Sequence, residues 1–167
     1  MTSDVFQLID MLSSVDSTDR QRAVQSLAAL GAKAKPAAVP LVRICGDSDE
    51  SLREWSVAAL EEMGAPALTD TESLIALIKA DCEDVAYWAV TLLGRLGESA
   101  TTGLAALEDA LLDHRYDSVR QRSAWALGCI GPAASEALPA LEAAAAGTQG
   151  RLARLAQRSI AQIKQSG

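Results

Sequence analysis

Few residues of this chain have side chains that could carry out catalysis. It holds three cysteines, Cys45, Cys82 and Cys129, and a single histidine, His114. Nucleophilic catalysis by a thiol needs a thiolate and a base that activates it, and no base adjoins Cys129. The cysteines lie roughly forty residues apart, which suits no compact zinc site. We therefore expect small packing cysteines in a reducing compartment, with no catalytic residue, no metal ligand and no cofactor.

The tryptophans and arginines indicate a role in binding. Aromatic residues make up only 4% of the sequence, yet three of them are tryptophans: Trp55, Trp88 and Trp125. Tryptophan and arginine are enriched in binding hot spots, because each joins a large contact area to a polar or cationic group. These side chains are suited to recognising a partner molecule. Whether they can act together depends on the elements that position them.

An internal repeat supplies those elements. Similar phrases end at four glycines separated by 33, 33 and 34 residues: Gly31, Gly64, Gly97 and Gly131. A fifth phrase, RLARLAQRSIAQIK, follows at the same spacing and ends in Lys164. Within a phrase the apolar residues recur at helical spacing, as Val119, Ala124, Leu127 and Ile130 do. A shorter apolar segment precedes each phrase, after a stretch rich in glycine or proline, so the sequence predicts five helical hairpins.

The repeat phrase and its linker are clearest in SVRQRSAWALGCIGPAASEALPAL, from Ser118 to Leu141. They resemble the HEAT-repeat family, particularly the short bacterial type related to phycobilin-lyase subunits. The resemblance covers essentially the whole chain and implies an all-α fold, an α-solenoid with a right-handed superhelix of five HEAT-like hairpins. It implies one domain, 1–167, whose second helices line the concave side. The repeats are expected at about 3–31, 34–64, 67–97, 100–131 and 134–165.

Acidic residues cluster at the turns that lead into the inner helices. They are Asp16 and Asp19, then Asp47, Asp49 and Glu50, then Asp81, Glu83 and Asp84, then Asp113 and Asp117. Carboxylates at such places cap free amide groups and oppose the helix dipole, so we expect a structural role. The resemblance adds a partner for the turn acid, an arginine just inside the inner helix, here Arg20, Arg53 or Arg120. The fifth turn, GTQG, has no acid.

A stripe at i, i+3 and i+7 remains on each inner helix once the core positions are removed. It holds all three tryptophans and four arginines against one acid, Glu62, so it is positive within an acidic molecule. We expect a partner-binding surface here, although each tryptophan could instead cover a seam between two hairpins. The predicted contact residues are Arg22, Trp55, Trp88, Arg95, Arg122, Trp125, Leu155 and Arg158.

Three enzymatic relatives of this architecture can be compared with the residues. Deoxyhypusine hydroxylase uses repeated His-Glu pairs to hold two irons, and one histidine, His114, is too few. HEAT-like alkylpurine DNA glycosylases place Trp, Arg and Asp in a concave groove. The only acid on the stripe here is Glu62, so a relative of these glycosylases is the less favoured alternative. Phycobilin-lyase subunits share the repeat phrase, so a bilin lyase or chaperone-like accessory subunit stays an alternative. The favoured hypothesis is a non-enzymatic scaffold for a peptide or protein.

Charge and hydropathy narrow the partners further. A net charge of −7 argues against duplex nucleic acid, which needs a basic face, and the positive stripe would suit an acidic peptide or protein surface. No run of 18 residues lacks a charge, so no membrane span is expected. The opening MTSDVFQLID has acids where a signal peptide would carry Lys or Arg. We expect a cytoplasmic monomer.

Overall fold

The computed structural model describes residues 4–147 and 150–165, and all regular structure in these ranges is helical. Packing divides the chain into two compact units, residues 1–70 and 71–167. Unit 1 contains two helical hairpins and unit 2 contains three. The prediction of one domain spanning 1–167 stays a prediction. Ser3, at the start of the first predicted repeat, and Thr148 and Gln149, in the fifth turn, lie outside the described residues.

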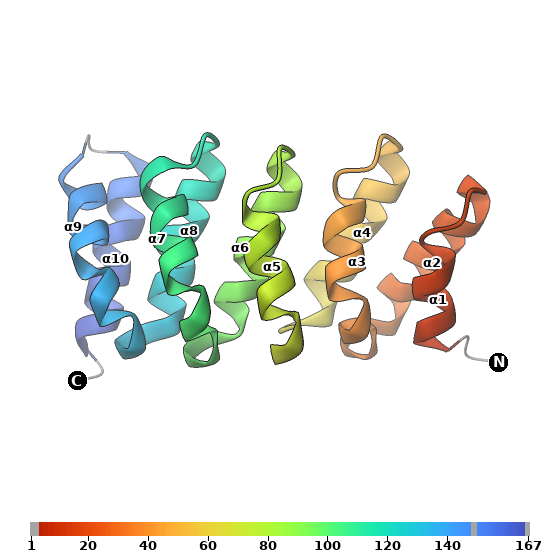
Figure 1. Cartoon of the computed structure of the whole chain (residues 1–167), viewed down its shortest axis with the longest axis horizontal. Helices are drawn as coiled ribbons and strands as arrows, with labels where there is room; N and C mark the ends of the chain where they lie inside the picture. The colour runs from red at the N-terminus through yellow and green to blue at the C-terminus, as the bar shows by residue number, and fades with distance from the viewer. Residues whose placement is uncertain (1–3, 148–149, 166–167) are drawn as a thin grey trace. The chain divides into compact units, whose positions relative to one another are not determined.

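The hairpins of unit 1 pair a short outer helix with a longer inner one (Figure 1). The first is α1 (Val5–Met11) with α2 (Ser17–Leu30), and the second is α3 (Ala38–Ile44) with α4 (Glu50–Met63). The two inner helices, α2 and α4, pack along each other. Leu27, Leu52 and Leu60 are fully buried. The predicted helical spacing therefore does bring the apolar side chains into one core.

Unit 2 repeats this arrangement three times. Its hairpins are α5 (Thr71–Ile78) with α6 (Glu83–Arg95), α7 (Leu104–Asp113) with α8 (Asp117–Ile130), and α9 (Leu138–Ala146) with α10 (Arg151–Gln165). The inner helix α8 packs on α6 on one side and on α10 on the other. These three inner helices therefore form a continuous layer, and the outer helices pack against one side of that layer.

The glycines that end the repeat phrases are helix stops, as predicted. Gly31, Gly64, Gly97 and Gly131 all have positive φ angles, between 52° and 77°. A residue with a Cβ atom adopts that conformation only with strain, so glycine is required there. Three of them begin a short 3-10 turn that leads to the next hairpin: η1 (Gly31–Ala37), η3 (Gly97–Gly103) and η4 (Gly131–Ala137). A shorter turn, η2 (Leu68–Asp70), precedes α5.

Two other glycines allow the inner helices of unit 2 to approach closely. A Cβ atom on Gly94 of α6 would lie 2.5 Å from Cζ3 of Trp125 and 3.0 Å from Cα of Ala126, both on α8. A Cβ atom on Gly128 of α8 would lie 2.6 Å from Oγ of Ser159 on α10. Such distances are far below van der Waals contact. The three inner helices are therefore held together through glycine seams.

The acidic turns differ between the two units. In unit 1, Asp16 accepts a hydrogen bond from the Thr18 amide at 2.8 Å, and Asp49 accepts one from the Ser51 amide at 2.9 Å. These carboxylates cap α2 and α4 as predicted. The N-cap residues of α6 and α8 are Cys82 and Tyr116, neither of which makes a side-chain cap. Capping by a turn carboxylate is therefore confirmed for unit 1. At α6 and α8 the acids lie in the first helical turn, where they oppose the helix dipole without capping the helix.

The arginines just inside three inner helices bind the turns through backbone carbonyls. Arg20 donates to the Ser14 carbonyl at 2.9 Å, and Arg53 donates to the Asp47 carbonyl at 2.8 Å. Arg120 donates to the His114 carbonyl at 3.3 Å and also pairs with the carboxylate of Asp117. The expected arginine–acid ladder is therefore mainly an arginine–carbonyl arrangement.

Candidate functional site

Three side chains from α6 and α8 form a stack on the inner-helix layer of unit 2. The guanidinium carbon of Arg122 lies 3.8 Å from the ring centroid of Trp125 and 5.2 Å from that of Tyr87. All three side chains are half-buried. A cation held over aromatic rings is attracted by their electron-rich faces, more strongly when it is partly desolvated. We call Tyr87, Arg122 and Trp125 the arginine stack.

A buried threonine fixes the direction of the arginine. Nε of Arg122 donates to the hydroxyl oxygen of Thr91 at 2.8 Å, and that hydroxyl donates to the Tyr87 carbonyl at 2.8 Å. Thr91 is fully buried in α6. The guanidinium is thus held by both rings and by one hydrogen bond on its Nε edge. Within the described part of the chain, its two terminal nitrogens have no hydrogen-bond or ion-pair partner.

A small pocket opens beside the arginine stack. Its volume is about 170 Å³, and its lining comes from α6, α8 and α10: Tyr87, Ser118, Gln121, Arg122, Trp125, Arg151 and Leu155. Two guanidinium groups and no carboxylate line it, as far as the described residues go. Glu83 lies at its edge, where the Ser118 hydroxyl donates to the glutamate carboxylate. We call this cavity the arginine pocket.

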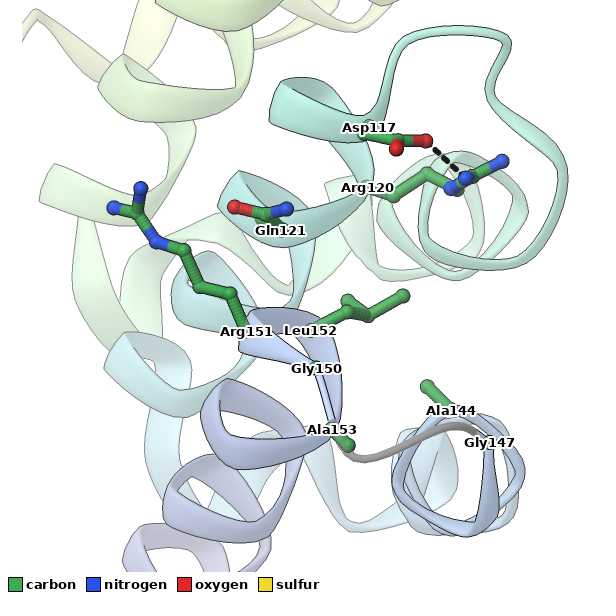
Figure 2. A pocket seen from close by; sticks show the side chains of 9 residues that line it. All are labelled: Asp117, Arg120, Gln121, Ala144, Gly147, Gly150, Arg151, Leu152 and Ala153. Atoms are coloured by element: carbon green, nitrogen blue, oxygen red, sulfur yellow. Dashed lines mark hydrogen bonds and ion pairs between the residues drawn. The ribbon is translucent and has the colours of Figure 1, made fainter.

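A second pocket of about 280 Å³ adjoins the first along the starts of α8 and α10 (Figure 2). It shares Gln121 and Arg151 with the arginine pocket. Figure 2 shows the Arg151 side chain extending away from the Asp117–Arg120 pair, on the far side of Gln121. Part of the second pocket's wall is formed by Gly147 and Gly150, which flank residues outside the described ranges. The arginine pocket is the better-defined site.

The predicted contact residues in unit 2 fall into different environments. Arg122, Trp125 and Leu155 line the arginine pocket, whereas Arg158 is exposed on α10 outside it. Trp88 is only 7% exposed, and the guanidinium of Arg95 lies 5.5 Å from its ring centroid. The hypothesis that Trp88 lines a binding groove needs correction, because a ring so fully covered has little surface to offer a partner.

The predicted contact residues in unit 1 are exposed, and they line neither of the two pockets. Trp55 on α4 is 40% exposed. The Arg22 side chain on α2 is 71% exposed and lies 4.0 Å from the Asp19 carboxylate. An ion pair this exposed contributes little, so neither side chain is held in one geometry as Arg122 is.

Four residues of the site are not among the predicted contact residues: Thr91, Ser118, Gln121 and Arg151. Ser118 and Arg151 lie four residues before Arg122 and Leu155, on the same faces of α8 and α10. Extending the stripe by one helical turn toward the helix starts would have found both. Tyr87, which precedes Trp88 in the sequence, is also absent from the predicted contact residues.

The cysteine and histidine environments agree with structural roles. Burial raises the pKa of the Cys129 thiol, and this outweighs the opposing effect of the Arg122 and Arg158 charges, so the thiol stays protonated near neutral pH. Nε2 of His114 lies 2.9 Å from the Ile78 carbonyl oxygen, while its Nδ1 accepts from the Tyr116 amide at 3.3 Å. Both ring nitrogens of His114 are therefore used in the turn that follows α7. Among the described residues, no cluster of potential metal ligands is found.

Comparison with known proteins identifies the family. The sequence model for HEAT repeats matches residues 71–161, more than half of the chain, so the chain belongs to the HEAT-repeat family. No curated protein sequence matches it. None of the described helices is both long and apolar enough to cross a membrane.

Solved structures show the same fold at low sequence identity. An engineered protein matches with a TM-score of 0.64 and 22% identity, over 98% of this chain and 80% of its own. A designed armadillo repeat protein in complex with the peptide (KR)4 matches with a TM-score of 0.64 and 18% identity, over 93% and 80%. The complex of CpcE and CpcF of phycocyanin lyase from Nostoc sp. PCC7120 gives 0.65 and 21%, over 98% and 66%. The predicted class, an all-α solenoid of HEAT-like hairpins, is confirmed.

Proposed function

We propose that this protein is a non-enzymatic scaffold that binds an acidic peptide or protein segment on the inner-helix layer of unit 2. The observation that carries the proposal is the arginine stack beside a pocket with two guanidinium groups. The net charge of the chain is −7, so this positively charged site differs from the protein as a whole. An acidic segment would be attracted to that site and repelled by much of the remaining surface.

The stack holds Arg122 in one direction. Arg122 is half-buried, and its Nε donates to the Thr91 hydroxyl. Its terminal nitrogens have no partner among the described residues, and Arg122 lines the pocket, so these donors are available to bind an anion. Trp125 and Leu155 add apolar contact area.

The structural neighbours agree with a binding role through fold alone. One designed armadillo repeat protein was solved with a basic peptide, (KR)4, and CpcE was solved in complex with CpcF. The arginine pocket has the opposite charge from that needed for a basic peptide, so our proposal names an acidic partner. Duplex nucleic acid is not expected, because the whole-chain charge opposes it. Monomeric state and cytoplasmic location remain predictions from the sequence.

A pair of peptides tests this proposal. One is a short labelled peptide in which glutamate alternates with leucine and glycine, and the other has lysine in place of each glutamate. Fluorescence anisotropy should show binding of the glutamate peptide only, with affinity that falls as salt is added. Trp125→Leu should weaken it by about 2 kcal/mol, roughly thirtyfold, because this ring forms one wall of the pocket. Equal binding of both peptides, or of the variant and wild type, would contradict the proposal.

The bilin-handling alternative can be tested separately. Its basis is the repeat phrase and the fold shared with the phycocyanin lyase subunits. The raised pKa of Cys129 makes that thiol a poor nucleophile for attaching a pigment. Mixing the protein with a bilin should leave the visible absorption spectrum of the pigment unchanged. A shifted spectrum that persists in a Cys129→Ala variant would favour non-covalent bilin binding over peptide binding.

A further inference from the structure

We propose that the arginine pocket is a receptor for a single carboxylate, bound by the terminal nitrogens of Arg122 with Arg151 as a second cation. This inference rests on the proposed function, since the carboxylate would belong to the acidic segment. It could come from an Asp or Glu side chain or from the C-terminus of a partner chain. The shared chemistry is a planar anion with two oxygens.

The geometry of Arg122 determines which donors are left for a ligand. Trp125 and Tyr87 cover the guanidinium, and the Thr91 hydroxyl takes its Nε–H at 2.8 Å. The remaining donors are on the two terminal nitrogens, which can present two parallel N–H groups to a carboxylate. Because the guanidinium is already held in place, little side-chain entropy is lost when the anion binds.

The charge and size of the pocket favour one small anion. A volume of about 170 Å³ admits a single functional group with a short stem. Arg151 begins α10, so the positive end of that helix dipole adds to its charge. Leu155 and Trp125 supply an apolar rim that suits the methylene groups of a glutamate.

Glu83 limits the donors and the positive charge that the pocket offers to an anion. Its carboxylate accepts the Ser118 hydroxyl at the pocket edge, so Ser118 donates to Glu83 instead of to a ligand. The negative charge of Glu83 weakens the attraction of the two arginines for any anion, whether carboxylate or phosphate. Selectivity for a carboxylate therefore rests on shape, because the two terminal nitrogens of Arg122 match the two oxygens of a planar carboxylate.

Small molecules can test the site without knowledge of the partner. The wild-type protein is titrated with N-acetylglutamate amide, which carries only a side-chain carboxylate, and with N-acetylglycine, which carries only a terminal one. N-acetylglutamine amide is the neutral control, and inorganic phosphate is the competing anion. The NMR signals of the Arg122 Nε–H and the Trp125 indole N–H report binding at the pocket. Comparison of the affinities of these two ligands shows whether the site prefers a side-chain carboxylate or a C-terminal carboxylate.

Three variants assign the binding to individual residues. Arg122→Gln should weaken carboxylate binding by about tenfold or more, and Arg122→Lys should restore only part of it, because an ammonium lacks the planar pair of donors. Arg151→Gln should weaken it by about threefold. Arg154→Gln is the matched control, since Arg154 is exposed on the same helix and does not line this pocket. Circular dichroism checks that every variant remains folded.

The outcomes separate this inference from the proposed function. The carboxylate site is supported if both signals shift with a carboxylate and the shifts depend on Arg122. It is overturned if phosphate binds more tightly, or if Arg122→Gln and Arg154→Gln behave alike. A glutamate peptide that binds wild type and Arg122→Gln equally would overturn the site and leave the peptide-binding function standing. A site that takes the small carboxylates while no acidic peptide binds would support the site and contradict the function.

Discussion

Trp55 in unit 1 and Trp88 in unit 2 occupy the same place in their repeat phrases, and their environments differ. Trp55 is 40% exposed on α4, whereas Trp88 is 7% exposed on α6. The corresponding residue of α8 is Arg122, which belongs to the arginine stack. One repeat position therefore holds an exposed ring, a buried ring and a cation facing a pocket.

The difference lies in what surrounds each position. In unit 2, Gly94 lets the edge of Trp125 lie directly on α6, and Thr91 and Tyr87 then hold Arg122. In unit 1, the residue equivalent to Gly94 in α4 is Glu61, which is exposed. A repeat position alone does not decide whether a tryptophan packs or binds. The side chains of the adjacent inner helix decide it.

The largest expected effect is a difference in the free energy of unfolding between variants at the two tryptophans. Trp88→Ala should lower the free energy of unfolding by about 3–5 kcal/mol, because it leaves a large cavity. Trp55→Ala should lower it by less than about 1 kcal/mol, because much of that ring is already in water. Urea unfolding followed by circular dichroism measures both. Similar losses for the two variants would remove the distinction between these positions.

The next effect concerns the glycine seam. Gly94→Ala should destabilise the protein by about 1–3 kcal/mol, because the new methyl group would meet the Trp125 ring and the Ala126 backbone. The matched change in unit 1, Glu61→Ala, should change stability by less than about 0.5 kcal/mol, since Glu61 is exposed. Helix propensity alone predicts the reverse, a stabilisation by Gly94→Ala. Urea unfolding of the two variants therefore distinguishes close packing from propensity.

A smaller effect should follow from loosening Arg122. Thr91→Val keeps the shape of a buried side chain but removes the hydroxyl that accepts from Nε. We expect acidic-peptide affinity to fall by about 1 kcal/mol, roughly fivefold, because the guanidinium loses its fixed direction. Thr101→Val, at an exposed hydroxyl, is the control. Unchanged affinity in the Thr91 variant would show that the hydrogen bond does not prepare the site.

The smallest effect should be a pH dependence confined to unit 1. The Thr18 amide hydrogen bond lowers the pKa of Asp16, so this cap stabilises α2 at neutral pH and is lost as pH falls below about 3.8 through the folded-state pKa. Cys82 and Tyr116, the N-cap residues of α6 and α8, make no side-chain hydrogen bond that caps their helices. As the pH is lowered, amide hydrogen exchange should therefore show fraying at the start of α2 at a higher pH than at the starts of α6 and α8. The Asp16→Asn substitution should remove this pH dependence. Equal acid fraying at α8 would contradict the comparison.

Most of the fold could be predicted from the sequence because its signals are local. Helical spacing identified the core leucines, and the phrase-ending glycines gave the helix stops with positive φ. The close approach at Gly94 and Gly128 was not predicted, since it depends on which helices lie opposite. Capping was not predicted correctly for α6 and α8, because Glu83 and Asp117 are the first residues of these helices and do not precede them.

The site was predicted in part, because some of its residues follow from local helical spacing. The stripe found Arg122, Trp125 and Leu155, because one helix face is readable from residue spacing. It could not show that Trp88 is covered, since burial depends on packing between elements. It also omitted Arg151, which enters the pocket from the first turn of α10. Spacing places Arg151 on the same helix face as Leu155, but it does not predict that the long side chain of Arg151 reaches the pocket.

The most direct test of the central claim compares two arginines, Arg122 in unit 2 and Arg22 in unit 1. Both variants, Arg122→Gln and Arg22→Gln, remove one positive charge from an inner helix. Titration with the labelled glutamate peptide at physiological salt should show a loss of about tenfold or more for Arg122→Gln and less than about twofold for Arg22→Gln. Equal losses would mean that general charge attracts the peptide, and the arginine pocket would then have no special part in binding.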